Sequence, residues 1–120
     1  MDPEAIRDVF QALGRPLHIR RMFGGLGIYQ DDLMFALAIR GEIYLKTDAE
    51  TLERFEALGS RPFSYTSRGG RNVSMSYWLM PDSALEEPDE AARLGELAIA
   101  AALRRRRASP PKRPRSRSPR

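Results

Sequence analysis

The stretch Arg20-Arg21-Met22-Phe23-Gly24-Gly25-Leu26-Gly27-Ile28-Tyr29 decides much of the fold, because it sets three glycines in four positions among apolar and aromatic residues. Glycine is favoured where φ is positive or where a neighbouring backbone leaves no room for a Cβ atom. Gly24, Gly25 and Gly27 therefore predict a kinked or bulged strand that enters a sheet. The alternative is a phosphate-binding loop. A dinucleotide loop needs a third glycine that leads into a helix, but Gln30 and strand-like sequence follow here.

Strand patterns continue on the C-terminal side of this stretch. Residues 17–30 are predicted to be one extended segment, and residues 33–40 and 43–46 two further strands. Side chains alternate between the two faces of a strand. Both faces of residues 33–40 are apolar, so this strand is expected to be central or covered on both sides. Strict alternation assigns Leu33, Phe35, Leu37 and Ile39 to one face and Met34, Ala36 and Ala38 to the other.

Three helices are predicted around these strands. Residues 3–13 repeat apolar side chains at helical spacing. Thr47 and Glu50 have the spacing of a capping box, with Asp48 as the competing cap, and this pattern opens a second helix that ends at Gly59. A third helix is expected from about residue 88.

The last two strands, residues 63–66 and 73–79, form a hairpin around Arg68-Gly69-Gly70-Arg71. The resulting order is α-β-β-β-α-β-β-α. This order predicts an α+β fold, a two-layer sandwich of an antiparallel sheet and helices. The side chains expected in its core are Phe35, Leu37, Leu45, Phe55, Tyr77 and Leu97.

Charge is unevenly divided along the 120 residues. Residues 1–103 hold all 16 acidic residues and 11 basic ones, a net charge of −5, whereas residues 104–120 hold nine basic residues and no acidic one. Such asymmetry indicates an arm that contacts an anionic partner. The sequence therefore predicts a 1–103 domain followed by a disordered Arg/Pro/Ser tail at 104–120. The residues expected to contact nucleic acid without sequence preference are Arg104, Arg105, Arg106, Arg107, Lys112, Arg113, Arg115, Arg117 and Arg120.

Candidate chemistry is sparse. The absence of cysteine excludes disulfides and thiolate metal sites. His18 is the only histidine, and one imidazole does not make a zinc site or a catalytic triad. Asp31 and Asp32 fit a turn better than a metal site, which needs further converging oxygens. No cofactor, metal or catalytic residue is expected. No apolar run is long enough to cross a bilayer and the start is no signal peptide, so a cytoplasmic location is expected.

An apolar sheet face is the more informative surface. Five residues are predicted to line the face away from the helices and to form a protein-contact patch, unless a helix or a crossing strand covers them. They are Met34, Ala36, Ala38, Trp78 and Met80. Four aromatic residues also suggest stacking of single-stranded nucleic acid, but packing in the core or an interface is favoured because residues 1–103 are acidic. These are Tyr29, Tyr44, Tyr77 and Trp78.

Separated motifs carry a resemblance to a known family. Residues 21–29 read R-M-F-G-G-L-G-I-Y and are followed, in order, by residues 33–37, 43–46, 63–65 and 77–81. From about residue 5 to 102 the chain resembles the TfoX/Sxy N-terminal domain family. The resemblance implies a two-layer fold similar to that of secretion chaperones, a role in transcriptional coregulation of competence genes beside a DNA-bound activator, and no catalytic residues. The family's namesakes carry a second, helical C-terminal domain. The basic segment begins where that domain would start, which implies a stand-alone domain.

The sequence thus favours a non-enzymatic bacterial regulatory or protein-interaction module. Its expected partners are a protein, such as a DNA-bound regulator, and nucleic acid through the basic tail, but no membrane. Two alternatives stay open. One is a small ligand-binding domain or enzyme with a pocket between helices and sheet, and the other is a chaperone-like module that forms a homodimer through its sheet face.

Overall fold

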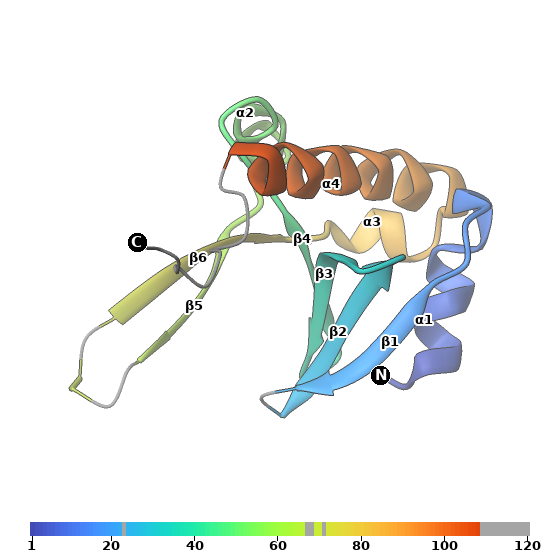
Figure 1. Cartoon of the computed structure of the whole chain (residues 1–120), viewed down its shortest axis with the longest axis horizontal. Helices are drawn as coiled ribbons and strands as arrows, with labels where there is room; N and C mark the ends of the chain where they lie inside the picture. Colours follow the sequence, from blue (N-terminus) through green and yellow to red (C-terminus); the bar gives the residue numbers. More distant parts are fainter. Residues whose placement is uncertain (23, 67–68, 71, 109–120) are drawn as a thin grey trace, which may run out of the picture.

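The computed structural model describes residues 1–22, 24–66, 69–70 and 72–108, with the side chains of residues 65, 66 and 72–75 left aside (Figure 1). One six-stranded antiparallel sheet has the order β1-β2-β3-β4-β6-β5. This architecture confirms the predicted α+β class. The strands are β1 (His18–Met22), β2 (Gly25–Gln30), β3 (Leu33–Ile39), β4 (Glu42–Lys46), β5 (Pro62–Thr66) and β6 (Asn72–Leu79).

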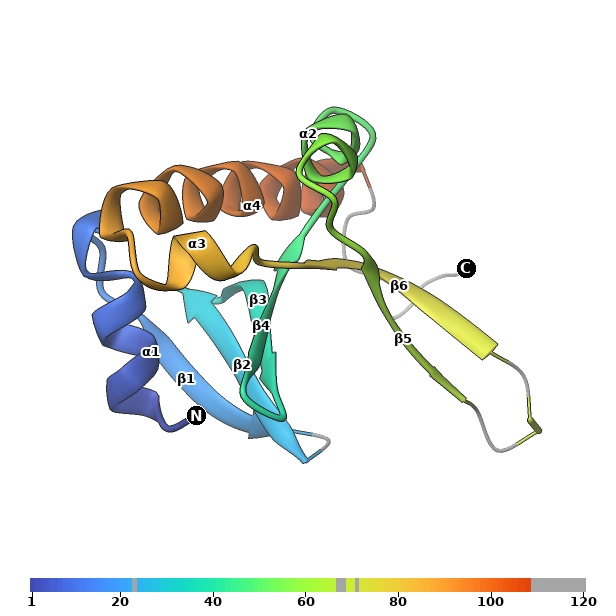
Figure 2. The same ribbon diagram turned by 180° about the vertical axis from the view of Figure 1, so that it is seen from behind.

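Four α-helices and one short 3₁₀ helix complete the described part of the fold. They are α1 (Pro3–Val9), η1 (Gln11–Leu13), α2 (Leu52–Ala57), α3 (Asp82–Leu85) and α4 (Pro88–Ala108). The long helix α4 crosses the sheet and contacts β3, β4 and η1, whereas the β5–β6 hairpin projects away from the helices (Figures 1 and 2). The predicted helix from about residue 88 is confirmed.

The segment predicted as one extended strand at 17–30 is two strands. β1 and β2 pair in antiparallel register, with Met22 opposite Gly25. Gly24 lies in the turn between them with φ at +76°, a conformation that a side chain disfavours. The glycine run therefore makes a tight reversal as well as a strand, which adds a strand to the predicted order.

A bulge in β3 corrects the predicted faces of that strand. Ile28 of β2 pairs with Ala36, but the next residue, Tyr29, pairs with Met34, so Phe35 has no opposite residue on β2. A bulge of this kind shifts the alternation by one residue. Phe35 and Ala36 consequently both pack in the helix-side core.

The main core lies between the helices and the sheet. Its largest fully buried side chains are Phe35, Phe55, Ile6, Ile28, Ile43, Leu45 and Met80. Of the six predicted core residues, all but Leu97 are buried, and Leu97 is partly buried against the same cluster. Leu37 and Tyr77, however, belong to a second cluster on the opposite face of the sheet.

The start of α2 differs from the predicted capping box. Thr47 is buried and continues the pairing of β4 with β6, because its backbone N–H donates to the Ser76 carbonyl at 2.8 Å. The Asp48 carboxylate accepts from the Glu50 N–H instead, and the helix begins only at Leu52. Local spacing suggested the box, but cross-strand pairing holds Thr47 in the sheet.

Candidate functional site: the basic end of α4 and the open sheet face

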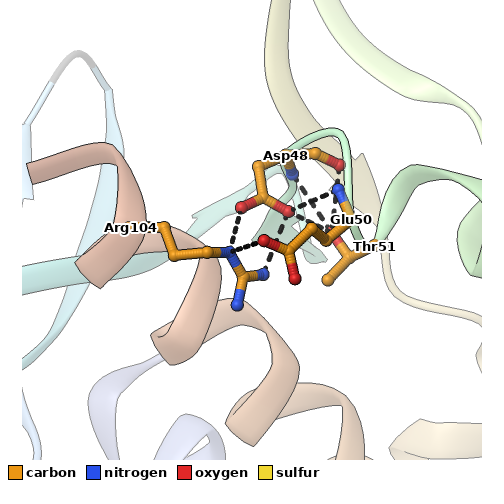
Figure 3. A network of polar contacts seen from close by, with 4 residues as sticks. All are labelled: Asp48, Glu50, Thr51 and Arg104. Atoms are coloured by element: carbon orange, nitrogen blue, oxygen red, sulfur yellow. Dashed lines mark hydrogen bonds and ion pairs between the residues drawn. The ribbon is translucent and has the colours of Figure 1, made fainter. Parts of the chain in front are cut away.

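The final turn of α4 carries the first four arginines of the predicted basic tail. Arg104 to Arg107 are helical, since α4 runs to Ala108. The guanidinium of Arg104 meets Asp48 through Nε at 2.6 Å and Nη2 at 3.1 Å, and its Nε also lies 3.3 Å from Glu50 (Figure 3). A two-pronged contact of this type fixes an arginine more firmly than a single one. Arg104 therefore joins α4 to the turn before α2.

The network around Arg104 changes the acidity of its partner. The hydrogen bond from Arg104 is the main cause that holds the pKa of the Asp48 carboxyl below its usual range. Backbone N–H groups of Glu50 and Thr51 lower this pKa further. Asp48 is thus a stable anion at neutral pH, and its charge is matched by Arg104.

The basic residues of the last turn differ in their contacts. Arg106 pairs with Asp32 at 3.0 Å and also donates to the Asp32 carbonyl at 3.2 Å. Within the described part of the chain, Arg105 and Arg107 make no ion pair. Two of the four arginines are therefore tied to the fold, and two leave their charge unmatched. The remaining residues of the predicted nucleic-acid contact, Lys112, Arg113, Arg115, Arg117 and Arg120, lie outside the described residues.

Lys46, at the end of β4, lies near these arginines. Its Nζ donates to Ser76 Oγ at 2.5 Å and lies 5.1 Å from the centroid of the Tyr77 ring. Burial, followed by the charge of Arg105, lowers the pKa of the Lys46 ammonium. Sequence reasoning missed this lysine, because only the tertiary fold brings β4 beside the end of α4.

The open face of the sheet, on the side opposite α4, carries the second apolar cluster. Leu37, Tyr44 and Tyr77 are buried at its centre, and half-buried side chains surround them. Arg20 lies 5.2 Å from the Tyr29 ring centroid, and Arg61 Nη2 pairs with Glu42 at 3.3 Å. The half-buried members are Met22, Met34, Ile39, Phe63 and Leu79.

This composition corrects the predicted interface. Met34 does lie on the open face, but the other four predicted residues are on the helix side. The bulge at Phe35 turns Ala36 and Ala38 toward α4. Trp78, opposite Leu45 in the sheet, and Met80 pack into that same core. Tyr77 and Leu79 share the open face.

Gly24, Gly25 and Gly27 are required for two different structural reasons. Gly24 has a positive φ and open space around it. A Cβ on Gly25 would lie 2.6 Å from the carbonyl oxygen of Ala38, and one on Gly27 would lie 2.5 Å from the sulfur of Met22. Both reasons in the prediction, positive φ and close approach, therefore apply, each at a different residue.

The space between helices and sheet is occupied by the main core. A depression of about 710 Å³ lies at the rim between the N-terminus and the β1–β2 turn, with Arg21 and Arg40 in its lining. His18 is exposed on β1. Among the described residues there is no group of three His, Asp or Glu side chains placed to hold a metal ion. None of the described helices combines the length and the apolar character needed to span a bilayer.

Two comparisons with known proteins relate this chain to a family. A segment of 56 residues is 39% identical to DNA transformation protein TfoX1 of Aliivibrio fischeri (strain ATCC 700601 / ES114) and covers 47% of this chain. That segment spans about a quarter (26%) of the relative's length. Residues 8–102, most of the chain and every element from η1 to the body of α4, match the TfoX N-terminal domain. The chain therefore belongs to the TfoX N-terminal domain family.

Proposed function

We propose that this chain is a non-enzymatic, cytoplasmic regulatory domain that is held on nucleic acid by its basic C-terminal end and contacts a protein through its open sheet face. Family membership and the similarity to a DNA transformation protein support a role in competence-related regulation.

The single observation that carries the nucleic-acid part is the set of unmatched cations at the end of α4. Arg105 and Arg107 have no carboxylate partner in the described structure. Residues 109–120 add five basic residues and no acidic one. Cations without internal partners can neutralise phosphates and release counterions, which favours binding without sequence preference.

The protein-contact part is supported by the open sheet face. Three basic residues, Arg20, Lys46 and Arg61, border its apolar centre. The carboxylate of Glu42 also lies at this border, where it accepts a hydrogen bond from the Tyr44 hydroxyl. The complementary partner is therefore a protein with an apolar patch bordered by carboxylates. We propose that this partner is itself bound to DNA, because the basic end of α4 would bring the domain there.

The nucleic-acid part is tested with the full chain and a labelled DNA duplex over a salt series. If about five phosphates are neutralised, the affinity should fall roughly 10²- to 10³-fold between 50 and 200 mM salt. Replacing the five basic residues of 109–120 by glutamine should remove most of this salt dependence. The control replaces the four arginines among them by lysine, which preserves charge. If the affinity of all three proteins fell equally with salt, or if none bound the duplex, the proposed attachment of the basic end to nucleic acid would be refuted.

The protein contact is tested by recovering partners from native cells after nuclease treatment. Met34→Lys places a charge at the apolar open face, and Leu58→Lys places the same charge at an exposed apolar residue on the C-terminal side of α2, 47% exposed. A partner retained by the native chain and by Leu58→Lys but lost by Met34→Lys supports the assignment of the face. A partner retained equally by both variants contradicts it.

A further inference from the structure

We propose that the depression between the last turn of α4, the turn at residues 47–50 and Ser76 of β6 binds a phosphate group of a nucleic acid backbone, with Lys46 and Arg105 as its cations. This inference rests on the proposed function and deepens it. It assigns a phosphate contact to the folded body, in addition to the segment after residue 108.

The depression is a defined feature at the junction of three elements. Its volume is about 500 Å³, and side chains from β4, β6 and α4 line it together with the turn before α2. Ala108, the last residue of α4, is also part of the lining. The basic residues 109–120 follow Ala108 directly in the sequence, so the depression adjoins the start of this segment.

The charges around the depression leave two cations available. The two carboxylates in the lining, Asp48 and Glu50, both pair with Arg104. Lys46 has a neutral hydroxyl and an aromatic ring as its contacts, and Arg105 makes no ion pair in the described structure. Three cations face two carboxylates, which leaves the depression a net charge of +1, and Lys46 and Arg105 are its two cations without an ion pair in the described structure.

The donors of the depression suit a phosphate. Lys46 donates to Ser76 Oγ, which leaves the hydroxyl hydrogen of Ser76 available for an anion. Arg105 supplies a fork that matches two phosphate oxygens. Lys46 is half-buried, and both its burial and the nearby Arg105 lower its pKa, while the charge of Asp48 acts in the opposite direction. A bound anion would oppose both effects, because it stabilises the charged ammonium and reduces the repulsion between the two cations.

The test compares single-charge variants of the full chain on the same labelled duplex. Lys46→Gln and Arg105→Gln should each reduce the slope of log affinity against log salt by about 0.9, and lower the affinity roughly tenfold at 50 mM salt. Arg93→Gln is the matched control, because Arg93 is an exposed residue of α4 without an ion pair in the described structure. Lys46→Arg should restore the native slope. Thermal unfolding of each variant checks that the fold is retained.

The outcomes separate this inference from the proposed function. If the native chain does not bind the duplex, both fail. If it binds with the expected salt response but Lys46→Gln or Arg105→Gln behaves like Arg93→Gln, the depression is not a phosphate site and attachment through the segment after residue 108 still stands. Competition by inorganic phosphate tests the ligand chemistry of the depression. Release of the duplex at phosphate concentrations where an equal ionic strength of chloride has no effect would support the site, because the free ion displaces the duplex specifically only where both bind. Equal release by phosphate and chloride would contradict it.

Discussion

Phe35 is the extra residue of a bulge in β3, where it has no opposite residue on β2. Its ring packs in the helix-side core. It packs edge-on against Phe10, with ring centroids 5.6 Å apart, and its side chain is fully buried. The ring thus joins the segment between α1 and η1 to the centre of the sheet. Loss of a ring at such a position removes buried apolar contacts and leaves a cavity.

Phe35→Ala is expected to lower the free energy of unfolding by roughly 3–5 kcal/mol. Denaturant unfolding followed by circular dichroism measures this change. Leu58→Ala serves as the control, because Leu58 is 47% exposed and its truncation should cost under about 0.5 kcal/mol. A loss below about 1 kcal/mol for Phe35→Ala would contradict the position of this ring in the core.

Gly24 and Gly25 are neighbours with opposite requirements. Gly24 needs a positive φ but has free space, whereas Gly25 has no positive φ and no space beside the Ala38 carbonyl. Asparagine tolerates the left-handed conformation better than other residues with a side chain. Alanine, the smallest side chain, still adds the Cβ that Gly25 cannot accommodate.

We therefore expect Gly24→Asn to fold with little loss of stability and Gly25→Ala to be strongly destabilised. Gly24→Val should also be destabilised, because a β-branched residue is penalised at positive φ. Thermal unfolding of the three variants gives the comparison. Equal melting temperatures for Gly24→Asn and Gly25→Ala would show that space at residue 25 is not limiting.

Tyr77 provides a pH-dependent probe of the open sheet face. Burial raises the pKa of its phenol to about 12, above the usual value near 10. The folded state therefore keeps the proton that the unfolded state loses, so stability is complete below pH 10 and decreases as the pH rises from 10 toward 12. The slope over this range should reach about 1 kcal/mol per pH unit near pH 11.

Unfolding free energies of the native chain and of Tyr77→Phe over this pH range give the test. Phenylalanine keeps the ring but does not titrate, so the variant should lose this share of the alkaline destabilisation. The titration of Tyr44, whose pKa is also raised, mainly by burial, remains in both proteins. Identical pH profiles would contradict the burial of the Tyr77 hydroxyl.

At the scale of elements, the contact between α4 and the turn before α2 is the main polar connection at the basic end. Arg104 and Asp48 are 56 residues apart in the sequence, and their side chains are about one third and one quarter exposed. Partial exposure weakens an ion pair through solvent screening, but the two-pronged geometry and the additional backbone N–H contacts of Asp48 favour it.

A double-mutant cycle with Asp48→Asn and Arg104→Gln should give a coupling free energy of about 1 kcal/mol at neutral pH. Because the pKa of Asp48 is lowered in the folded state, this stabilisation is present above the unfolded pKa of a carboxyl and is lost as the pH falls below about 4. The more exposed Arg15–Glu96 pair is the control, with an expected coupling under about 0.5 kcal/mol. A coupling near zero for Asp48–Arg104 would contradict the role assigned to this contact.

At the scale of the whole molecule, the position of the charges matters more than the net charge. All acidic residues lie within residues 1–103, whereas Arg104 to Arg107 place four consecutive cations at the C-terminal end of α4, two of which make no ion pair in the described structure. Helix α4 has 21 residues and is therefore about 30 Å long. Its two ends are separated by about three Debye lengths at 0.1 M salt. Charges near the start of α4 should therefore have little influence on an anion bound at its end.

Glu50→Gln and Glu86→Gln change the net charge equally but at different places. Glu50 lines the proposed phosphate site and pairs with Arg104, while Glu86 lies in the segment between α3 and α4. Duplex affinity at 100 mM salt should rise several-fold for Glu50→Gln and change less than about twofold for Glu86→Gln. An equal increase in both would mean that net charge alone controls binding.

Periodicity and turn chemistry in the sequence determined the class of the fold, most of its elements and most of the buried core. These features depend on residues close together in the chain, as in the glycine turn before β2 and the apolar repeat of α4. The division of charge is likewise a property of the sequence, and with it the expectation of a basic C-terminal end.

Only the tertiary structure determined which strand residues face the helices and which charged residues form ion pairs. The bulge at Phe35 exists only when β2 and β3 pair, and it moves Ala36 and Ala38 from the predicted open face into the core. Whether an arginine is matched depends on a partner distant in the sequence, 56 residues away for Arg104 and 74 for Arg106. Spacing along a chain carries no information on such contacts, because they form only after strands and helices have packed.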